Sequence, residues 1–227
     1  MSETATVVAL VEGATERYFV RDLLAPYLGE KGIWLEAVIL SKPGAKGGDV
    51  RFARAQKDIR NLLKQRSDTW VTLMIDYYGI GTDWPGYAES KRQADSAAKA
   101  SVMNGATARE VQTLFADRDP DRRFIPYVSM HETEALYFSD PATLAAGLGV
   151  ARKGIDAILG ECREPEGIND RPDGAPSKRL KALSPTFKKT VTGIGIAKAV
   201  GIDAMRRACP LFDAWVTSLE GLAGGAR

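Results

Sequence analysis

Val7-Val8-Ala9-Leu10-Val11 is the first apolar run of the sequence, and Glu12-Gly13-Ala14-Thr15-Glu16 follows it directly. The run has the length and the β-branched residues of a buried strand, and the glycine leads into a segment with helical spacing. This order places Glu12 at the carboxyl edge of a strand, where ligands bind in open α/β sheets. A carboxylate is costly to bury there unless a cation meets it. We therefore interpret Glu12 as part of a metal site, with a fixed Arg or Lys partner as the alternative.

The same arrangement recurs at residues 70–75, an apolar run that ends at Asp76. If these two strands are parallel neighbours joined by right-handed crossovers, Glu12 and Asp76 emerge on the same edge of the sheet and converge. Residues 33–40 predict a further strand between them. Residues 16–28 and 49–66 have the apolar spacing of amphipathic helices, and Asp49 is a candidate cap of the second.

The rest of the chain completes an α/β pattern. Residues 87–117 predict two helices broken near Asn104-Gly105, and residues 123–130 predict a fourth strand in which Pro126 indicates an edge position or a bulge. Beyond residue 141 the pattern favours short helices and loops. We therefore expect a mostly parallel sheet of about four strands flanked by helices in residues 1–140, with a helical extension packed on this core in residues 141–227.

Composition narrows the class of protein. The 227 residues are 44% hydrophobic and 26% charged, which is typical of a globular chain with one large core. No apolar run approaches the roughly 18 residues of a membrane span, and residues 1–4 lack the features of a signal peptide, so we expect a cytoplasmic protein that does not bind membranes. The two cysteines, Cys162 and Cys209, stand apart and predict neither a zinc site nor a disulfide.

Further carboxylates follow the predicted fourth strand. Glu132 and Glu134 come just after it, as Glu12 and Asp76 follow theirs, and either is a candidate third metal ligand. They share a side if the segment is extended, whereas a helix would place His131 and Glu134 on one face. His131 is the only histidine, and a structural role for it is the alternative to a functional one.

The net charge of +2 is too small to indicate nucleic-acid binding by the protein as a whole. Any contact with nucleic acid would therefore depend on local clusters of basic residues. We select Arg122, Arg123, Lys178 and Arg179 as candidate nucleic-acid-binding residues. Ser177 is expected to cap a helix, and two cations beside a helix amino terminus suit a phosphate. The alternative for each cluster is a solvated face.

The loop of residues 77–86 is rich in aromatic residues and glycines and follows Asp76. Exposed aromatic side chains there would stack on bases. The alternative is a packed lid over the edge of the sheet.

These motifs resemble known families. Glu12-Gly13-Ala14-Thr15-Glu16 after one strand and Asp76 after another look like the Toprim domain of topoisomerases, primases and overcoming-lysogenization-defect nucleases. More closely, several segments together resemble a stand-alone bacterial Toprim-like family, domain of unknown function 4276, whose members are often encoded near ATPases. The segments are Val11-Glu12-Gly13, Asp76-Tyr77-Tyr78-Gly79, Arg123-Phe124-Ile125-Pro126, His131-Glu132, Glu134-Ala135-Leu136, Pro176-Ser177-Lys178-Arg179 and Cys209-Pro210.

The resemblance implies a Toprim-like fold and phosphodiester chemistry on DNA or RNA with Mg²⁺ or Mn²⁺. The ion would be held by Glu12 and Asp76, and Glu16 matches a second acidic position that the nuclease branch uses for metal. A partner ATPase and a role in DNA processing or phage defence are further implications. One departure matters: the usual Asp-x-Asp motif is Asp76-Tyr77-Tyr78 here. Either Glu132 or Glu134 supplies the missing charge, or the site binds metal poorly.

Two main hypotheses follow. The first is a metal-dependent nuclease in which Glu12, Asp76 and Glu132 act at the site, Glu16 and Glu134 complete the metal ligands, and Lys178 neutralises charge on the phosphate. The second is a binding or regulatory module that keeps the fold without catalysis. Nucleotidyl or phosphoryl transfer to a small molecule is a third, weaker alternative. The sequence leaves open DNA against RNA, one ion or two, and the oligomeric state.

Overall fold

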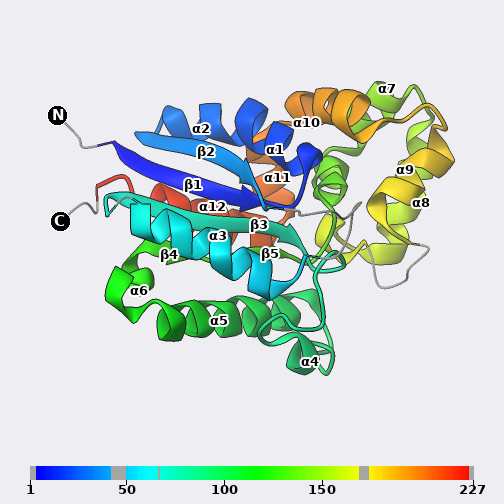
Figure 1. The fold of residues 1–227 in the computed structure, drawn as a ribbon. Helices are drawn as coiled ribbons and strands as arrows, with labels where there is room; N and C mark the ends of the chain where they lie inside the picture. The colour runs from blue at the N-terminus through cyan, green and yellow to red at the C-terminus, as the bar shows by residue number, and fades with distance from the viewer. Residues whose placement is uncertain (1–3, 42–49, 66, 169–173, 225–227) are drawn as a thin grey trace.

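The structure is a computed structural model that describes residues 4–41, 50–65, 67–168 and 174–224. Its centre is a five-stranded parallel sheet in the order β2-β1-β3-β4, with β5 also beside β3 (Figure 1). The strands are β1 (Ala5–Val11), β2 (Ile33–Ile39), β3 (Thr69–Asp76), β4 (Phe124–Ile125) and β5 (Val128–Ser129). The parallel α/β sheet predicted from the sequence is confirmed.

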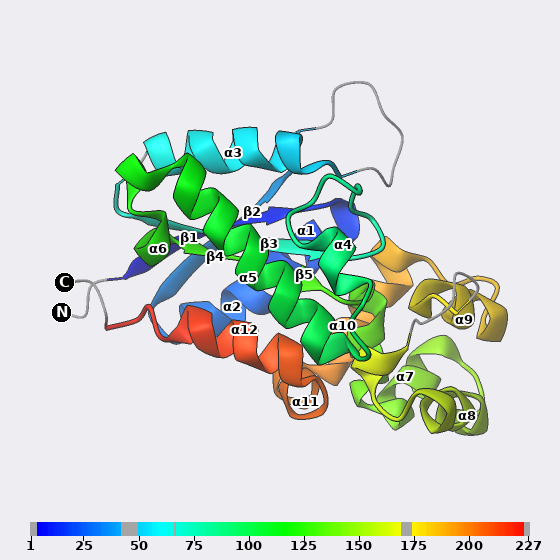
Figure 2. The same cartoon turned by 90° about the horizontal axis from the view of Figure 1, so that it is seen from below.

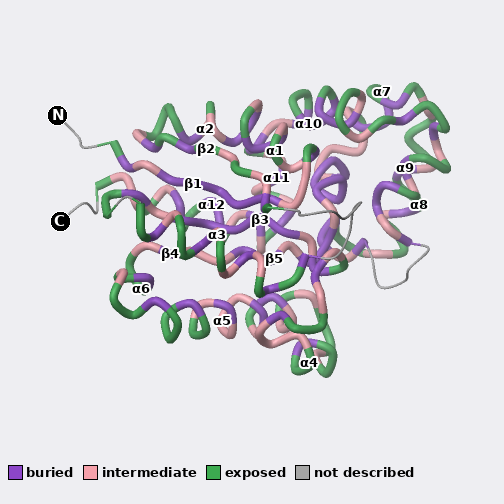
Figure 3. The backbone as a smooth tube through the Cα atoms, in the orientation of Figure 1, coloured by how far each residue is buried: buried purple, intermediate pink, exposed green. Residues whose placement is uncertain are grey.

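The register of the sheet brings the acidic strand ends together. β1 lies between β2 and β3, and Val11 is opposite Met74 of β3. Glu12 and Asp76 therefore leave neighbouring strands at the same edge, as the sequence predicts. Both strands are buried almost throughout because helices cover both faces of the sheet (Figure 3).

The predicted fourth strand is two short strands. β4 pairs with β3 at Val71 and Thr72, and β5 pairs with β3 at Ile75 and Asp76. Pro126 and Tyr127 separate them, since proline has no N–H to continue the ladder. The interruption places Ser129 directly opposite Asp76.

One face of the sheet is covered by α3 (Phe52–Gln65) and α5 (Ser96–Leu114) (Figure 2). The proposed cap of α3, Asp49, lies outside the described residues. The predicted break near Asn104-Gly105 is wrong, because α5 continues through it. Asp95 caps α5 by accepting from the N–H of Ala98 at 2.8 Å, and Asn104 Oδ1 accepts from the N–H of Val128 at 2.8 Å.

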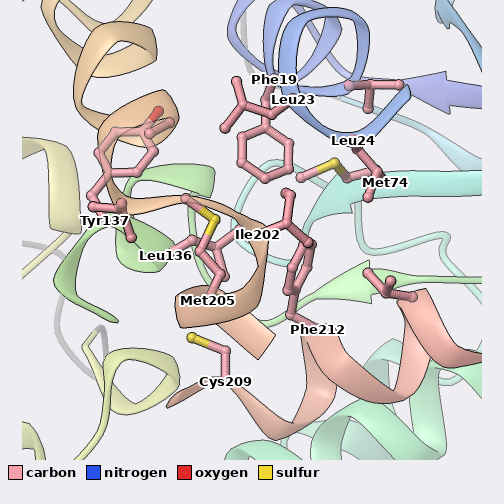
Figure 4. Packing of buried hydrophobic residues seen from close by; sticks show 14 of the residues in the cluster. Phe19, Leu23, Leu24, Met74, Leu136, Tyr137, Ile202, Met205, Cys209 and Phe212 are labelled. Atoms are coloured by element: carbon pink, nitrogen blue, oxygen red, sulfur yellow. The ribbon is translucent and has the colours of Figure 1, made fainter. Parts of the chain in front are cut away.

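The other face is covered by the first helices together with helices from the carboxyl-terminal part of the chain. α1 (Ala14–Phe19), η1 (Val20–Leu24) and α2 (Ala25–Gly29) run continuously, with a π-helical turn where one regular helix is expected. They share a hydrophobic cluster with α11 (Ile202–Ala208) and α12 (Pro210–Glu220). Figure 4 shows Phe19 and Leu23 packed among Met74, Met205 and Phe212. The carboxyl-terminal helices thus form part of a layer of the sheet domain.

The remaining elements complete the chain. They are α4 (Tyr87–Ser90), η2 (Ala116–Arg118), α6 (Pro120–Arg123), η3 (Thr133–Ser139), α7 (Pro141–Leu148), α8 (Arg152–Cys162), η4 (Pro165–Gly167), α9 (Pro176–Leu183), η5 (Lys189–Gly193) and α10 (Ile194–Val200). Figure 1 shows α7, α8 and α9 grouped beyond the ends toward which the strands point. Within the described residues, no helix is long and apolar enough to cross a membrane.

Candidate acidic site at the carboxyl edge of the sheet

Glu12 is positioned by a close approach to Gly79. Glu12 directly follows β1, and Gly79 lies in the loop that follows β3. A methyl group added at Gly79 would come within 2.5 Å of Glu12 Oε2 and 2.9 Å of Oε1. The Glu12 carboxylate therefore rests against the backbone of this loop, in space that only glycine leaves open.

Asp76 ends β3 and folds back onto its own loop. Its Oδ1 accepts a hydrogen bond from the N–H of Tyr78 at 3.0 Å, and its carbonyl accepts from the N–H of Gly79 at 3.0 Å. Burial raises the pKa of Asp76 to about 7, and the charges of Glu12, Glu132 and Glu16 add to the rise against the opposing Tyr78 N–H. The predicted acidic residues are thus close enough to act on one another electrostatically.

Glu16 joins this group from α1. The hydroxyl of Thr133, at the start of η3, donates to Glu16 Oε1 at 3.3 Å. This contact links the segment after β1 to the segment after β5. Glu16 is half-buried, as are Glu12 and Asp76.

Glu132 already has strong hydrogen-bond partners. The N–H and the hydroxyl of Ser177, at the start of α9, donate to its two oxygens at 2.8 and 3.0 Å, and Lys189 Nζ donates to Oε1 at 2.8 Å. Burial opposes ionisation, but Lys189 and Ser177 together lower the pKa of Glu132. The amino terminus of α9, which the sequence suggests for a phosphate, instead receives this carboxylate.

Glu134 is fully buried on η3. Lys189 Nζ lies 3.3 Å from its Oε2, whereas Oε1 and the hydroxyl of the neighbouring buried Tyr137 have no hydrogen-bond partner within the described residues. Burial raises the pKa of Glu134 to about 7 despite Lys189, and the charges of Glu132 and Glu16 contribute. Burial lowers the pKa of Lys189, but Glu134 and Glu132 outweigh it and raise that pKa above its ordinary value. Lys189 is therefore a cation at neutral pH.

The five predicted metal ligands thus fall into two groups. Lys189 lies against Glu132 and Glu134, whereas Glu12 and Asp76, with Glu16 nearby, form the second group. Among the described residues, no three His, Cys, Asp or Glu side chains are arranged to hold a metal ion by themselves. A pair of carboxylates still fits Mg²⁺, which commonly takes one or two carboxylates and completes its shell with water and substrate phosphate.

His131 has structural contacts. It is buried, its Nε2 lies 3.5 Å from Ser96 Oγ, and its carbonyl accepts from the hydroxyl of Ser129 at 2.7 Å. The residues after it form the 3₁₀ helix η3, which resolves the choice between helix and extended chain that the sequence leaves open.

The predicted basic residues occupy separate places. Lys178 is exposed on α9, next to Ser177, whereas Arg179 donates to Glu161 at 2.8 Å and to the carbonyl of Gly174. Arg123 donates to the carbonyl of Thr69, the first residue of β3, so it lies at the amino edge of the sheet with the exposed Arg122. Because β4 runs parallel to β3, residues that precede β4 reach the edge opposite Asp76. Arg122 and Arg123 therefore lie away from the acidic site, and their contact with nucleic acid stays a prediction.

Three residues at the site escape sequence reasoning. Lys189 is one of two adjacent lysines, and Gly79 is one glycine of a glycine-rich loop. The expectation that Ser177 caps a helix is wrong, because α9 begins at Pro176 with Ala175 as its cap. Nothing local distinguishes Lys189 from Lys188. The acidic partners that distinguish it lie 55 and 57 residues away.

Comparison with known proteins gives a family and two structures. A family model, Domain of unknown function (DUF4276), matches residues 11–220. Two structures of the C-terminal region of the OLD protein from Xanthomonas campestris pv. campestris, phased with mercury and with iodine, are similar over 96% of this chain and 95% of theirs. The identities are 15% and 14%, and the TM-scores are 0.41 and 0.43. No curated protein matches the chain.

Proposed function

This chain belongs to the family described as Domain of unknown function (DUF4276), and we propose that it is a metal-dependent phosphodiesterase that cleaves nucleic acid. The observation that carries the proposal is the pairing of Glu12 and Asp76 at one edge of neighbouring parallel strands. Burial raises the pKa of Asp76, and the negative charge of the nearby Glu12 adds to the rise. Two such groups favour a divalent cation over solvent.

Glu12 and Asp76 would hold one Mg²⁺ or Mn²⁺ ion. When bound, such an ion supplies the positive charge that activates water and stabilises the leaving oxygen of a phosphodiester. Asp76 gives up its proton near neutral pH, so cation binding strengthens as the pH rises through about 7. The three hydrogen bonds to Glu132 favour one ion on Glu12 and Asp76 over a pair of ions that includes Glu132.

The sequence suggests that Lys178 neutralises charge on the substrate phosphate, and Lys189 is a second lysine that can supply positive charge at the site. Its ammonium group lies 2.8 Å from Glu132 and 3.3 Å from Glu134, and both carboxylates favour its protonated form. We propose that this cation limits the negative charge of the site so that an anionic substrate can approach. Lys178, exposed one residue after Ser177, is a second candidate for contact with the phosphate backbone.

The proposal also names a substrate, nucleic acid, and a protein partner. They rest on the Toprim-like motifs around Glu12 and Asp76 rather than on a bound ligand. On the same basis, we propose that the protein acts with a partner ATPase in DNA processing or phage defence.

Calorimetric titration with Mg²⁺ and Mn²⁺ tests the proposal when it is combined with cleavage of DNA and RNA. The wild type should bind the ion, whereas Glu12→Gln and Asp76→Asn should abolish both binding and cleavage without loss of fold. Glu110→Gln, an exposed carboxylate on α5, is the matched control and should behave as wild type. Wild-type protein that cuts neither nucleic acid, alone or with its partner ATPase, would contradict the proposal.

The second candidate is a nucleic-acid-binding module without catalysis. The engagement of Glu132 and Glu134 by Lys189, and a tyrosine at position 78 in place of a second acidic residue, favour it. Binding of nucleic acid that is independent of Mg²⁺, with no metal binding by the protein, would establish this alternative.

A further inference from the structure

The aromatic loop after β3 contains both packed and exposed rings. Tyr77 and Trp84 are buried. The Tyr77 hydroxyl lies 2.9 Å from Ser90 Oγ, and Trp84 Nε1 donates to Thr107 Oγ1 at 2.9 Å. These two rings therefore fix the loop on the helices beside it. Tyr78, between Tyr77 and Gly79, is 45% exposed.

Tyr78 is tied directly to the acidic site. Its N–H donates to Asp76 Oδ1 at 3.0 Å, and the next residue, Gly79, is the one against which Glu12 rests. Any nucleotide whose phosphate reaches Glu12 and Asp76 therefore has its base or sugar near this loop.

The loop holds the Tyr78 backbone firmly. The Tyr77 N–H donates to the carbonyl of Ser129 at 2.8 Å. The Val50 N–H donates to the carbonyl of Gly79 at 2.9 Å, and the Val50 carbonyl accepts from the N–H of Gly81 at 3.0 Å. The Tyr78 ring meets the ring of Tyr77 edge-on, with centroids 5.4 Å apart and an interplanar angle of 90°. An aromatic ring fixed in this way loses little conformational freedom when it contacts a ligand.

We propose that Tyr78 is a base-stacking platform and that the substrate of the site is single-stranded or locally unpaired nucleic acid. This inference rests on the proposed function and specifies its substrate class. Unpaired bases expose their π-faces to an aromatic side chain, whereas bases inside a duplex are already stacked on their neighbours.

The residue type at position 78 agrees with this role. The Toprim-like resemblance leads one to expect an aspartate here, which would add a ligand and a negative charge beside Asp76. Tyrosine supplies a ring instead and leaves the site less negative. The change therefore exchanges a metal contact for a contact with the substrate.

Fluorescence anisotropy of labelled oligonucleotides in EDTA, at one fixed salt concentration, tests stacking separately from catalysis. The probes are a single strand, the matching blunt duplex, and an abasic strand with the same number of phosphates. The proteins are wild type, Tyr78→Phe, Tyr78→Ala and Trp34→Ala. Trp34 is a matched control because it is 61% exposed and lies near the start of β2, at the amino edge of the sheet.

Wild type should bind the single strand more tightly than the duplex. Tyr78→Ala should weaken single-strand binding roughly 5- to 150-fold, as the loss of one stacked base predicts, and leave duplex and abasic binding unchanged. Tyr78→Phe and Trp34→Ala should both bind as wild type does, and circular dichroism should show that every variant is folded.

Two results would overturn the inference. The first is that Tyr78→Ala binds the single strand as tightly as wild type does. The second is that Tyr78→Ala weakens the binding of all three probes equally. Either result would show that Tyr78 does not stack on a base. Mg²⁺-dependent cleavage of the duplex would then leave the proposed function standing on its own. Failure of wild type to bind or cut any of the probes would reject both proposals together.

Discussion

Gly79 controls the position of Glu12 from a different strand end. Because Gly79 has no side chain, the Glu12 carboxylate occupies the space beside its Cα atom. A methyl group added at Gly79 would lie 2.5 Å from Glu12 Oε2. Because the clashing atoms are the end of a flexible side chain, Gly79→Ala should displace the carboxylate and leave the backbone largely in place.

We therefore expect Gly79→Ala to weaken Mg²⁺ binding and cleavage about tenfold or more, a loss of about 1.4 kcal/mol, with little change in Tm. Calorimetry and thermal unfolding measure the two effects. Gly160→Ala is the control, because a methyl group there meets nothing within 4 Å and the residue lies inside α8. A large fall in Tm for Gly79→Ala with unchanged metal affinity would show that the glycine serves the backbone instead.

Asp76 should destabilise the fold at neutral pH. Its pKa is raised from 3.8 to about 7 in the folded protein, chiefly by burial, so the folded state keeps a proton that the unfolded chain has released. Stability therefore falls as the pH rises from about 4 to about 7.

Asp76→Asn removes this ionisation and can keep the acceptor for Tyr78. We expect its Tm to exceed that of wild type at pH 8 by several degrees, since 1 kcal/mol corresponds to roughly 2–4 °C at this size, and to match wild type at pH 4. Thermal unfolding across this range measures the difference. A lower Tm at pH 8 would indicate that the ionised carboxylate has a structural cation partner.

At the scale of elements, Glu166 is the cap of α12. It lies in η4 and is buried, and its two oxygens accept from the N–H groups of Leu211 and Phe212 at 2.8 and 2.9 Å. The loss of a cap costs about 1–2 kcal/mol, so Glu166→Ala should lower the Tm by roughly 2–8 °C. The exposed neighbour Glu164→Ala is the control and should change the Tm little.

The same cap should respond to pH. Burial raises the pKa of Glu166 to about 7 against the two N–H donors, so its contribution to stability decreases as the pH rises from about 4.5 to about 7. Glu166→Gln does not titrate, so its Tm should fall less steeply over this interval than that of wild type. Equal slopes for the two proteins would contradict the assignment.

At the scale of the whole molecule, α12 joins the carboxyl-terminal part of the chain to the sheet. Trp215 stacks on Tyr127 with centroids 4.4 Å apart, and its Nε1 donates to Thr72 Oγ1 at 2.9 Å. Thr72 in turn donates to the carbonyl of Ile125 at 2.6 Å. One side chain therefore connects the last helix, β3 and β4.

Trp215→Ala should cost about 3–5 kcal/mol, which corresponds to roughly 6–20 °C in Tm, because it removes a buried ring and leaves Thr72 without this donor. Unfolding should remain a single transition, since the carboxyl-terminal helices share one hydrophobic cluster with β1 and α1. Trp34→Ala, the loss of an exposed tryptophan, should change the Tm far less. Separate transitions for the sheet and the carboxyl-terminal helices would reject this view.

The sequence by itself determined the parallel sheet, the place of Glu12 and Asp76 at the ends of neighbouring strands, and the family, because strand patterns and short motifs are local properties of the chain. The tertiary structure alone decided which cation meets which acid. Lys189 pairs with Glu132 across 57 residues, and Arg123 turns to the opposite edge. Such contacts depend on how helices dock and on where a strand is interrupted, and these depend on packing between segments that no local pattern records.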